Sequence, residues 1–457
     1  MNEFFGSVIW LIIALGILIS FHEFGHFWVA RRLGVKVLRF SIGFGRPLWR
    51  RIGKDGTEYV VAMLPLGGYV RMLDEREDEV PASQLHLAFN RKPVLSRIAI
   101  VIAGPLFNLI LAVAAFWLMF VVGIADMRPV LGHTQGMAAE AGLQRGATLT
   151  EVDGRAVETW SDAFQALIIP AVERRDITLE VDDPVRGVSR RQLPLSQLDD
   201  EFHESALLEY TGLSLWRPDI PTVLGEMKPD MPASAAGLQM GDRIARINDT
   251  AIDTWHDLVE VIDEQAQANR PLRIEWTRAG ETFSSDIVPI SDNSDGKERL
   301  IIGIQPAPLD EAAIEQWRSY QTIQRYGPVD ALGVAVRHTV RLTTDTLSML
   351  KQLVLGRASL DNLSGPITIA KLANDSASLG VARFLSFLGL ISLSLGILNL
   401  LPIPMLDGGH LMYYLIELVK GGPVSEKVQI AGQYVGLVML ASLMGLAFFN
   451  DILRLLA

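Results

Sequence analysis

The stretch His22-Glu23-Phe24-Gly25-His26 is an H-E-x-x-H motif, and the rest of the chain is best interpreted from it outward. If this segment is helical, His22 and His26 lie one turn apart on the same face, where two imidazoles can bind one divalent metal ion. Glu23 is then close enough to act on a water molecule at that metal. The motif therefore predicts a metal site, with zinc as the expected ion and Glu23 as the general base.

An apolar run from Phe4 to Phe21 leads directly into the motif and is long enough to cross a bilayer. Ionisable side chains at membrane depth are energetically costly and usually serve a function. Asn2 and Glu3 stand where a signal peptide would have basic residues, and no small-residue cleavage site follows the run. We therefore predict a retained transmembrane helix over residues 1–30.

The composition is typical of a membrane protein with soluble parts. Of the 457 residues, 49% are hydrophobic, and the mean hydropathy is +0.26. The net charge of -11 argues against nucleic acid as a partner. The chain has no cysteine, which excludes disulfides, thiol nucleophiles and Cys-ligated zinc. A metal must therefore rely on histidine and carboxylate ligands.

Three further apolar segments predict transmembrane helices, at 97–125, 379–411 and 428–450. Basic residues follow the first helix, starting at Arg31, and others precede the second, ending at Arg97. By the positive-inside rule this flank is cytoplasmic, so both chain termini and the segment after the second helix lie on the outer side. The two histidines lie at the basic end of their helix, which places the metal toward the cytoplasmic side.

Polar and helix-breaking residues interrupt the second span at Gly104-Pro105 and Asn108. Gly and Pro are tolerated in such helices where neighbours satisfy the backbone. We expect Asn108 to bond to a facing helix, with a direct catalytic role as the alternative.

Strand-like segments with glycine turns characterise region 31–96, among them Gly67-Gly68-Tyr69-Val70-Arg71-Met72. Their apolar residues suit a β element that dips into the membrane beside the metal site. Non-helical backbone is tolerated there only where it is buried in protein or lines a water-filled cavity. A small cytoplasmic hairpin is the alternative.

An internal repeat lies within the polar region between the second and third spans. Ala141-Gly142-Leu143-Gln144, followed by Trp160, recurs at a constant offset as Ala236-Gly237-Leu238-Gln239, followed by Trp255. Each copy resembles a PDZ domain, which predicts PDZ domains at 126–220 and 221–326, followed by amphipathic helices over 327–378.

The two copies differ in detail. The second copy has Asp242 in the PDZ-like pattern, and the first has Ala147 in its place. The segment Tyr210-Thr211-Gly212-Leu213-Ser214-Leu215 resembles a carboxylate-binding loop for the second copy. PDZ domains bind extended chains by strand addition, so capture of a peptide ligand is one function of the pair. A steric filter over the membrane site is the other.

The third apolar run ends in an unusual sequence, from Asn399 through Pro402 and Pro404 to Asp407 and His410. Two prolines in three residues stop a regular helix, and a carboxylate at membrane depth requires a polar cavity. Two histidines, one carboxylate and an open position form a normal catalytic zinc set. Asp407 is therefore the predicted third ligand. His410 competes with it, although a hydrogen-bonding role suits His410 better.

Together these motifs resemble the site-2 protease family of intramembrane zinc metalloproteases, over essentially the whole chain. The resemblance implies a polytopic α-helical membrane protein with about four transmembrane helices, a membrane-associated β element and two inserted periplasmic PDZ (α+β) domains. It implies Zn2+ as the cofactor of a metalloendopeptidase, with His22, His26 and Asp407 as ligands and Glu23 as base. Residues implied or expected to hold an unwound substrate strand are Asn399, Pro402, Pro404, Gly67, Gly68, Tyr69 and Val70.

The resemblance also implies partners and a location. The substrate would be a single-span membrane protein, such as an anti-sigma factor already cut by another protease in the sigma-E envelope-stress response, or a remnant signal peptide. The enzyme would act in the lipid bilayer of a bacterial inner membrane. Two other classes of function stay open on the residues alone: a metal-dependent transporter, which leaves the repeated domains without a purpose, and a non-catalytic scaffold.

Overall fold

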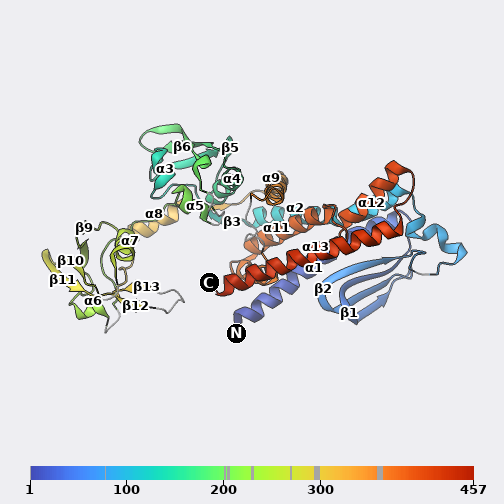
Figure 1. The fold of residues 1–457 in the computed structure, drawn as a ribbon, viewed down its shortest axis with the longest axis horizontal. Coiled ribbons are helices and arrows are strands. Elements are labelled where there is room, and N and C mark those ends of the chain that lie inside the picture. The colour runs from blue at the N-terminus through green and yellow to red at the C-terminus, as the bar shows by residue number, and fades with distance from the viewer. Residues whose placement is uncertain are drawn as a thin grey trace. The chain divides into compact units, whose positions relative to one another are not determined.

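The computed structural model describes residues 2–77, 79–199, 202, 206–227, 231–267, 270–292, 299–357 and 364–456. It forms two compact units, which we describe separately (Figure 1). One unit combines Met1–Ala125 with Ile323–Leu456, and the other comprises Asp126–Thr322.

Four helices of the first unit are long and apolar enough to cross a membrane: α1 (Asn2–Arg32), α2 (Val94–Val122), α11 (Val381–Leu400) and α13 (Glu426–Leu456). They match the four predicted spans, with shifted ends, since α1 continues past residue 30 and α2 covers 94–122 rather than 97–125. α2 contacts both α1 and α11, and the axes of the helices are roughly aligned, whichever way the chain runs along them (Figure 1).

The predicted third span, 379–411, includes the two prolines, where the sequence predicted that the regular helix stops, and α11 does end at Leu400. A separate helix, α12 (Asp407–Lys420), begins at Asp407 and takes the place of most of the loop expected after residue 411. Pro402 and Pro404 lack amide hydrogens and restrict the residues before them, so the chain turns here. The turn is tight, because a Cβ atom on Gly408 would lie 2.0 Å from the carbonyl oxygen of Leu401.

The predicted β element is a long hairpin of β1 (Val37–Ile52) and β2 (Glu58–Met72) that packs beside α1 (Figure 1). The hairpin folds back on itself, because Phe40 of β1 pairs with both Tyr59 and Val70 of β2. Within the described chain, β1 and β2 form a sheet of their own. The last part of β2, Gly68–Met72, pairs with β1 on one edge and has no further strand on the other.

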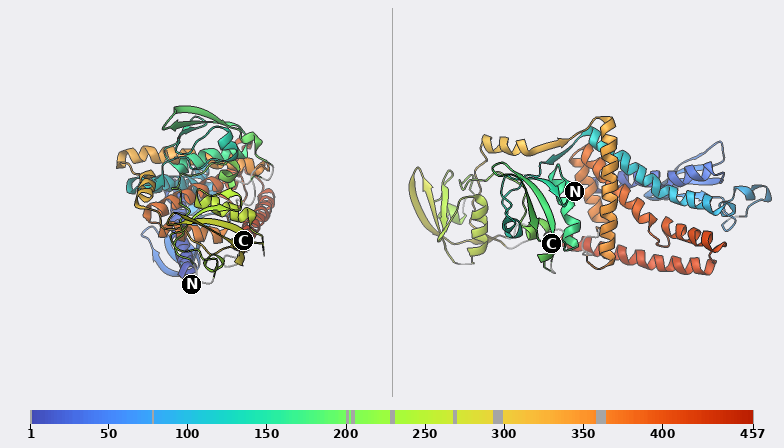
Figure 2. Two further views of the ribbon diagram at one scale, coloured as in Figure 1. Left: turned by 90° about the vertical axis from the view of Figure 1, so that its left-hand side faces the viewer. Right: turned by 90° about the horizontal axis from the view of Figure 1, so that it is seen from above.

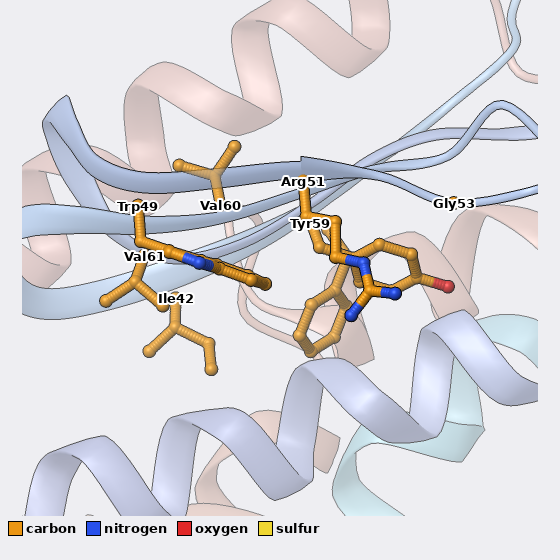
Figure 3. Close-up of a pocket in the computed structure, with 8 residues that line it drawn as sticks. Ile42, Trp49, Arg51, Gly53, Tyr59, Val60 and Val61 are labelled. Atoms are coloured by element: carbon orange, nitrogen blue, oxygen red, sulfur yellow. The ribbon is translucent and has the colours of Figure 1, made fainter.

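One face of this hairpin is apolar and open. Leu48, Trp49 and Ile52 are more than half exposed. A cavity of about 410 Å³ lies against the sheet, and Figure 3 shows Trp49, Tyr59 and Arg51 among the side chains that line it. A surface of this kind suits contact with lipid better than contact with water.

Two helices occupy the region predicted to be amphipathic. α9 (Pro328–Val354) packs through Ala331 and Ala335 against α2 and lies across the helices of this unit (Figure 2). α10 (Pro366–Ser378) packs against α1. The amphipathic segment therefore belongs to the helical unit.

The second unit contains two four-stranded sheets with the same strand order, β5-β4-β6-β7 and β9-β8-β10-β11. The internal repeat is therefore a structural repeat of two α+β domains. The strands are β4 (Thr148–Val152), β5 (Arg155–Ala156), β6 (Ile177–Asp183), β7 (Gly187–Leu193), β8 (Arg243–Ile247), β9 (Thr250–Ala251), β10 (Leu272–Arg278) and β11 (Glu281–Ile287).

The tryptophans of the repeat mark the start of equivalent helices, α4 (Trp160–Val172) and α7 (Trp255–Gln265). In each copy the threonine before the tryptophan is the N-cap, and its hydroxyl accepts a hydrogen bond from the amide of the aspartate three residues later. Capping thus explains why Thr-Trp-x-Asp recurs.

The shorter elements of the chain are β3 (Ile124–Met127), α3 (Gly136–Glu140), α5 (Leu207–Thr211), α6 (Pro232–Ala235), β12 (Ile290–Asp292), β13 (Arg299–Ile301), α8 (Glu311–Tyr320), β14 (Gln321–Gln324), and 3-10 turns at Ala82–Leu87, Phe89–Arg91 and Leu195–Gln197.

The assignment of Tyr210–Leu215 to the second copy is wrong. Gly132 donates its amide to Ser214 O at 2.8 Å, and Leu131 pairs with Leu215, so the segment closes the first domain. The second domain is closed in the same way by its own later segment, where Gly225 donates to Gln305 O at 2.8 Å. In each domain a segment that follows the sheet pairs with a segment that precedes it, Leu215 with Leu131 and Pro306 with Leu224. The similarity between the two copies, which covers the core, did not show this pairing.

Candidate metal centre

Glycines allow α1 and α2 to cross closely at the motif. A Cβ atom on Gly25 would lie 2.4 Å from Ala103 O, and one on Gly104 would lie 2.2 Å from His26 Nε2. Small residues at such crossings let backbones approach. Both histidines therefore lie directly against the backbone of α2.

Three ligand-type atoms converge in this region. Asp407 Oδ2 lies 3.2 Å from His22 Nε2 and 3.4 Å from His26 Nε2, and the two Nε2 atoms are 3.3 Å apart. The edge of a tetrahedron is about 3.3 Å when its centre lies about 2.0 Å from each corner, the usual Zn–N and Zn–O distance. The spacing of the three atoms therefore fits a zinc ion.

The surroundings of Asp407 also favour a cation. Its Oδ2 is buried and makes no hydrogen bond to any residue that the structure describes. Within the described ranges, His22, His26 and Asp407 are the one group of three that meets the distance limit for metal ligands. A buried carboxylate facing two imidazole nitrogens is costly without a positive charge between them.

A backbone carbonyl fixes the ring of His26. Its Nδ1 lies 2.8 Å from Ile100 O, which can only accept, so Nδ1 carries the proton. The lone pair of Nε2 is then free toward Asp407 and His22. Such an outer hydrogen bond is the usual partner of a metal-binding histidine. The sequence did not reveal it, because the partner is a main-chain atom of another helix.

A cavity of about 530 Å³ surrounds the three ligands and Glu23. Gly68, Tyr69 and Val70 of β2 line it, and a Cβ atom on Gly68 would lie 3.0 Å from Glu23 Cγ. The H-E-x-x-H motif and the free edge of β2 therefore share one cavity.

The remaining predicted site residues have different positions. His410 of α12 lines the cavity but is not in the group of three ligands. Asn399 lies in the last turn of α11, with Pro402 and Pro404 in the turn that follows. Gly67 packs against Phe44. In the described chain, the lining of the cavity does not include Asn399, Pro402, Pro404 or Gly67.

Four helices of spanning length and a histidine–carboxylate cluster define an integral membrane protein with a metal centre of catalytic type. The chain belongs to peptidase family M50, whose family model matches residues 10–443.

Relatives are similar over the full length. The chain is 43% identical to the regulator of sigma-E protease RseP of Escherichia coli (strain K12), with all of both chains covered. It is also 43% identical to protease RseP of Yersinia pestis, over 98% of this chain and all of the relative. A Xylella fastidiosa (strain 9a5c) protein whose name includes the words zinc metalloprotease is 44% identical, over 99% of this chain and all of the relative.

The chain is therefore a zinc metalloprotease of the site-2 protease family, with Zn2+ as its cofactor. This result decides against the transporter and the scaffold as its function.

Proposed function

We propose that this protease cuts a transmembrane segment of a single-span protein within the bilayer, with zinc bound by His22, His26 and Asp407. The observation that carries the proposal is the convergence of these three atoms in a cavity among apolar helices. Two of the three ligands, His22 and His26, lie on the spanning helix α1, so the protease acts on substrate that reaches the same depth.

Glu23 is the general base. When bound, zinc would supply a Lewis acid that polarises the scissile carbonyl and acidifies the attacking water. Glu23, on the cavity wall one residue after His22, takes the proton of that water and passes it to the leaving amine. Its rigid helix and its contact with Gly68 keep the carboxylate beside the reacting bond.

The substrate helix must unwind before its peptide bond can be attacked, because its carbonyls are hydrogen-bonded internally. The free edge of β2 at Gly68–Met72 offers backbone groups to an extended strand in the same cavity. The exposed apolar face of the hairpin supports its position within the bilayer. Asn399 at the end of α11 and Pro402 and Pro404 in the turn after it would hold the strand beyond the cavity, whose lining they do not join.

An anti-sigma factor, already shortened by another protease, is the proposed natural substrate. The name of the Escherichia coli relative, which describes a regulator of sigma-E protease, supports this class. Remnant signal peptides present the same apolar single helix and are the second class.

The protein lies in the bacterial inner membrane, with the metal toward the cytoplasm and both termini in the periplasm. The cationic flanks at Arg31 and Arg97 support this orientation. The two α+β domains are PDZ domains on the periplasmic side, where they capture peptide or exclude substrates with large outer domains.

Cleavage of a model single-span substrate by the wild type and by Glu23→Gln tests the proposal. We expect the substitution to reduce the rate by at least about 100-fold, because it removes the base, while zinc content stays at the wild-type level. His22→Ala serves as the control that loses zinc as well. Cleavage by Glu23→Gln at the wild-type rate would contradict the role of Glu23, and full zinc content in His22→Ala would contradict the ligand set.

A further inference from the structure

We infer that Asn108 is a positioning residue for His22, accepting a hydrogen bond from its Nδ1 and so directing Nε2 toward the metal. The inference rests on the metal centre proposed above. Asn108 lies in α2 and is 1% exposed, and its side chain meets His22 with Asn108 Nδ2 3.2 Å from His22 Nδ1.

The required tautomer of His22 determines which amide atom must face it. A neutral imidazole that offers the lone pair of Nε2 to a metal carries its proton on Nδ1. Nδ1–H then needs an acceptor, as His26 already has in Ile100 O at 2.8 Å. If the amide nitrogen of Asn108 faced Nδ1–H of His22, two donors would face each other and no hydrogen bond would form.

The other end of the same amide points to the same conclusion. Asn108 Oδ1 is buried and has no hydrogen-bond partner among the residues that the structure describes. The oxygen and nitrogen of an amide have nearly the same shape, and their placement is decided by the hydrogen-bond network. A half-turn of the amide places Oδ1 against Nδ1–H of His22. The donor–donor contact and the unused acceptor are removed together.

The main-chain oxygen of Asn108 has a partner of its own, separate from the contact with His22. Ser392 of α11 donates its hydroxyl to the main-chain oxygen of Asn108 at 2.7 Å. One turn earlier, Gly104 leaves room for both imidazoles. α2 thus orients both histidines, through the carbonyl of Ile100 and through the side chain of Asn108.

If Asn108 only fills space, any side chain of similar shape should leave zinc binding unchanged. Two substitutions of similar shape, with and without an acceptor, therefore separate the two roles. Asn108→Asp keeps an oxygen acceptor beside Nδ1, whereas Asn108→Leu fills the space without one. Ser392→Ala is the matched control, since it removes a buried hydrogen bond of Asn108 without touching His22.

The experiment measures the Kd of zinc for full-length protein in detergent by competition with a chromophoric chelator, together with the visible spectrum after cobalt substitution. We expect Asn108→Leu to raise the Kd by about 10- to 100-fold and to shift the cobalt band. Asn108→Asp should stay within about threefold of the wild type, with an unshifted band, and Ser392→Ala should behave like the wild type.

Equal zinc affinity and equal cobalt spectra for Asn108→Leu and Asn108→Asp would overturn the inference. Melting temperature and gel filtration establish folding. If Asn108→Leu does not fold, Asn108→Ala takes its place against Asn108→Asp under the same criterion. Wild-type zinc affinity in His22→Ala would instead show that the proposed metal centre is wrong, which is a separate outcome.

Discussion

At the scale of single residues, Gly104 determines how closely the histidines lie against α2. The space that a side chain would need is occupied by imidazole, since a Cβ atom there would lie 2.2 Å from His26 Nε2 and 2.8 Å from His22 Cε1. The nearest atoms belong to rings held by Ile100 and by the ligand cluster, so they cannot withdraw cheaply.

Gly104→Ala should therefore lose zinc. Alanine favours a helix over glycine by about 1 kcal/mol, so α2 itself is not weakened by the change. Zinc content per protein after gel filtration is the measurement. Gly16→Ala in α1 is the control, because a Cβ atom there meets nothing within 4 Å. Full zinc content in Gly104→Ala would show that the rings can move aside.

At the scale of secondary-structure elements, the last part of β2, Gly68–Met72, has one edge paired with β1 and, in the described chain, no strand on the other edge. Phe40 of β1 pairs with Val70, and the opposite edge of Val70 lies along the cavity of the metal centre. An extended substrate needs amide donors from that edge.

Val70→Pro should slow substrate cleavage by at least about tenfold with zinc content unchanged, since proline removes a strand donor and fits poorly in a ladder. Cleavage rate and zinc content are measured on the same preparation. Val70→Ala, which keeps the amide, is the control. An unchanged rate in Val70→Pro would count against strand addition.

The two repeated domains differ at one buried ion pair. Arg278 binds Asp242 with two hydrogen bonds, of 2.6 and 2.7 Å, whereas Ala147 occupies the matching position of the first domain. Burial raises the pKa of Asp242, but the bonds from Arg278 and the amide of Gln239 outweigh it and hold the pKa below its ordinary value.

Because the folded-state pKa is lowered, the ion pair stabilises the second domain above the unfolded-state pKa of about 3.9, and this stability is lost as the pH falls through the folded-state pKa. We expect amide protection in β8 and β10 to fall more in the wild type than in Asp242→Ala between pH 6 and pH 3. Asp242→Ala should lower this protection at pH 6 by about 1–3 kcal/mol. Hydrogen exchange on the full chain measures both, and equal pH dependence of β8 and β10 in the wild type and in Asp242→Ala would contradict the argument.

At the scale of the whole molecule, one polar unit is inserted into the sequence of a helical one. Residues 126–322 follow α2, whose basic flank lies at its other end. The orientation of α2 therefore decides the side on which the whole insert lies.

Protease added outside spheroplasts of a Gram-negative host should digest the 126–322 unit and leave 31–96 protected. Fragments are identified by mass spectrometry, with and without detergent permeabilisation as the control. Protection of 126–322 in sealed spheroplasts, together with its digestion after permeabilisation, would reverse the proposed topology.

The sequence by itself determined the features that depend on residues close along the chain. The one-turn spacing of His22 and His26, the four apolar spans and the repeated pattern with its tryptophans are local patterns, and the structure contains each of them. Only the tertiary structure decided which distant atoms meet. It placed Asp407 Oδ2 3.2 Å from His22 Nε2, set Asn108 and Ile100 behind the two rings and joined Tyr210–Leu215 to the first domain. The physical reason is that these contacts depend on how helices cross and strands close, and such packing involves residues far apart in the chain, where no local period records it.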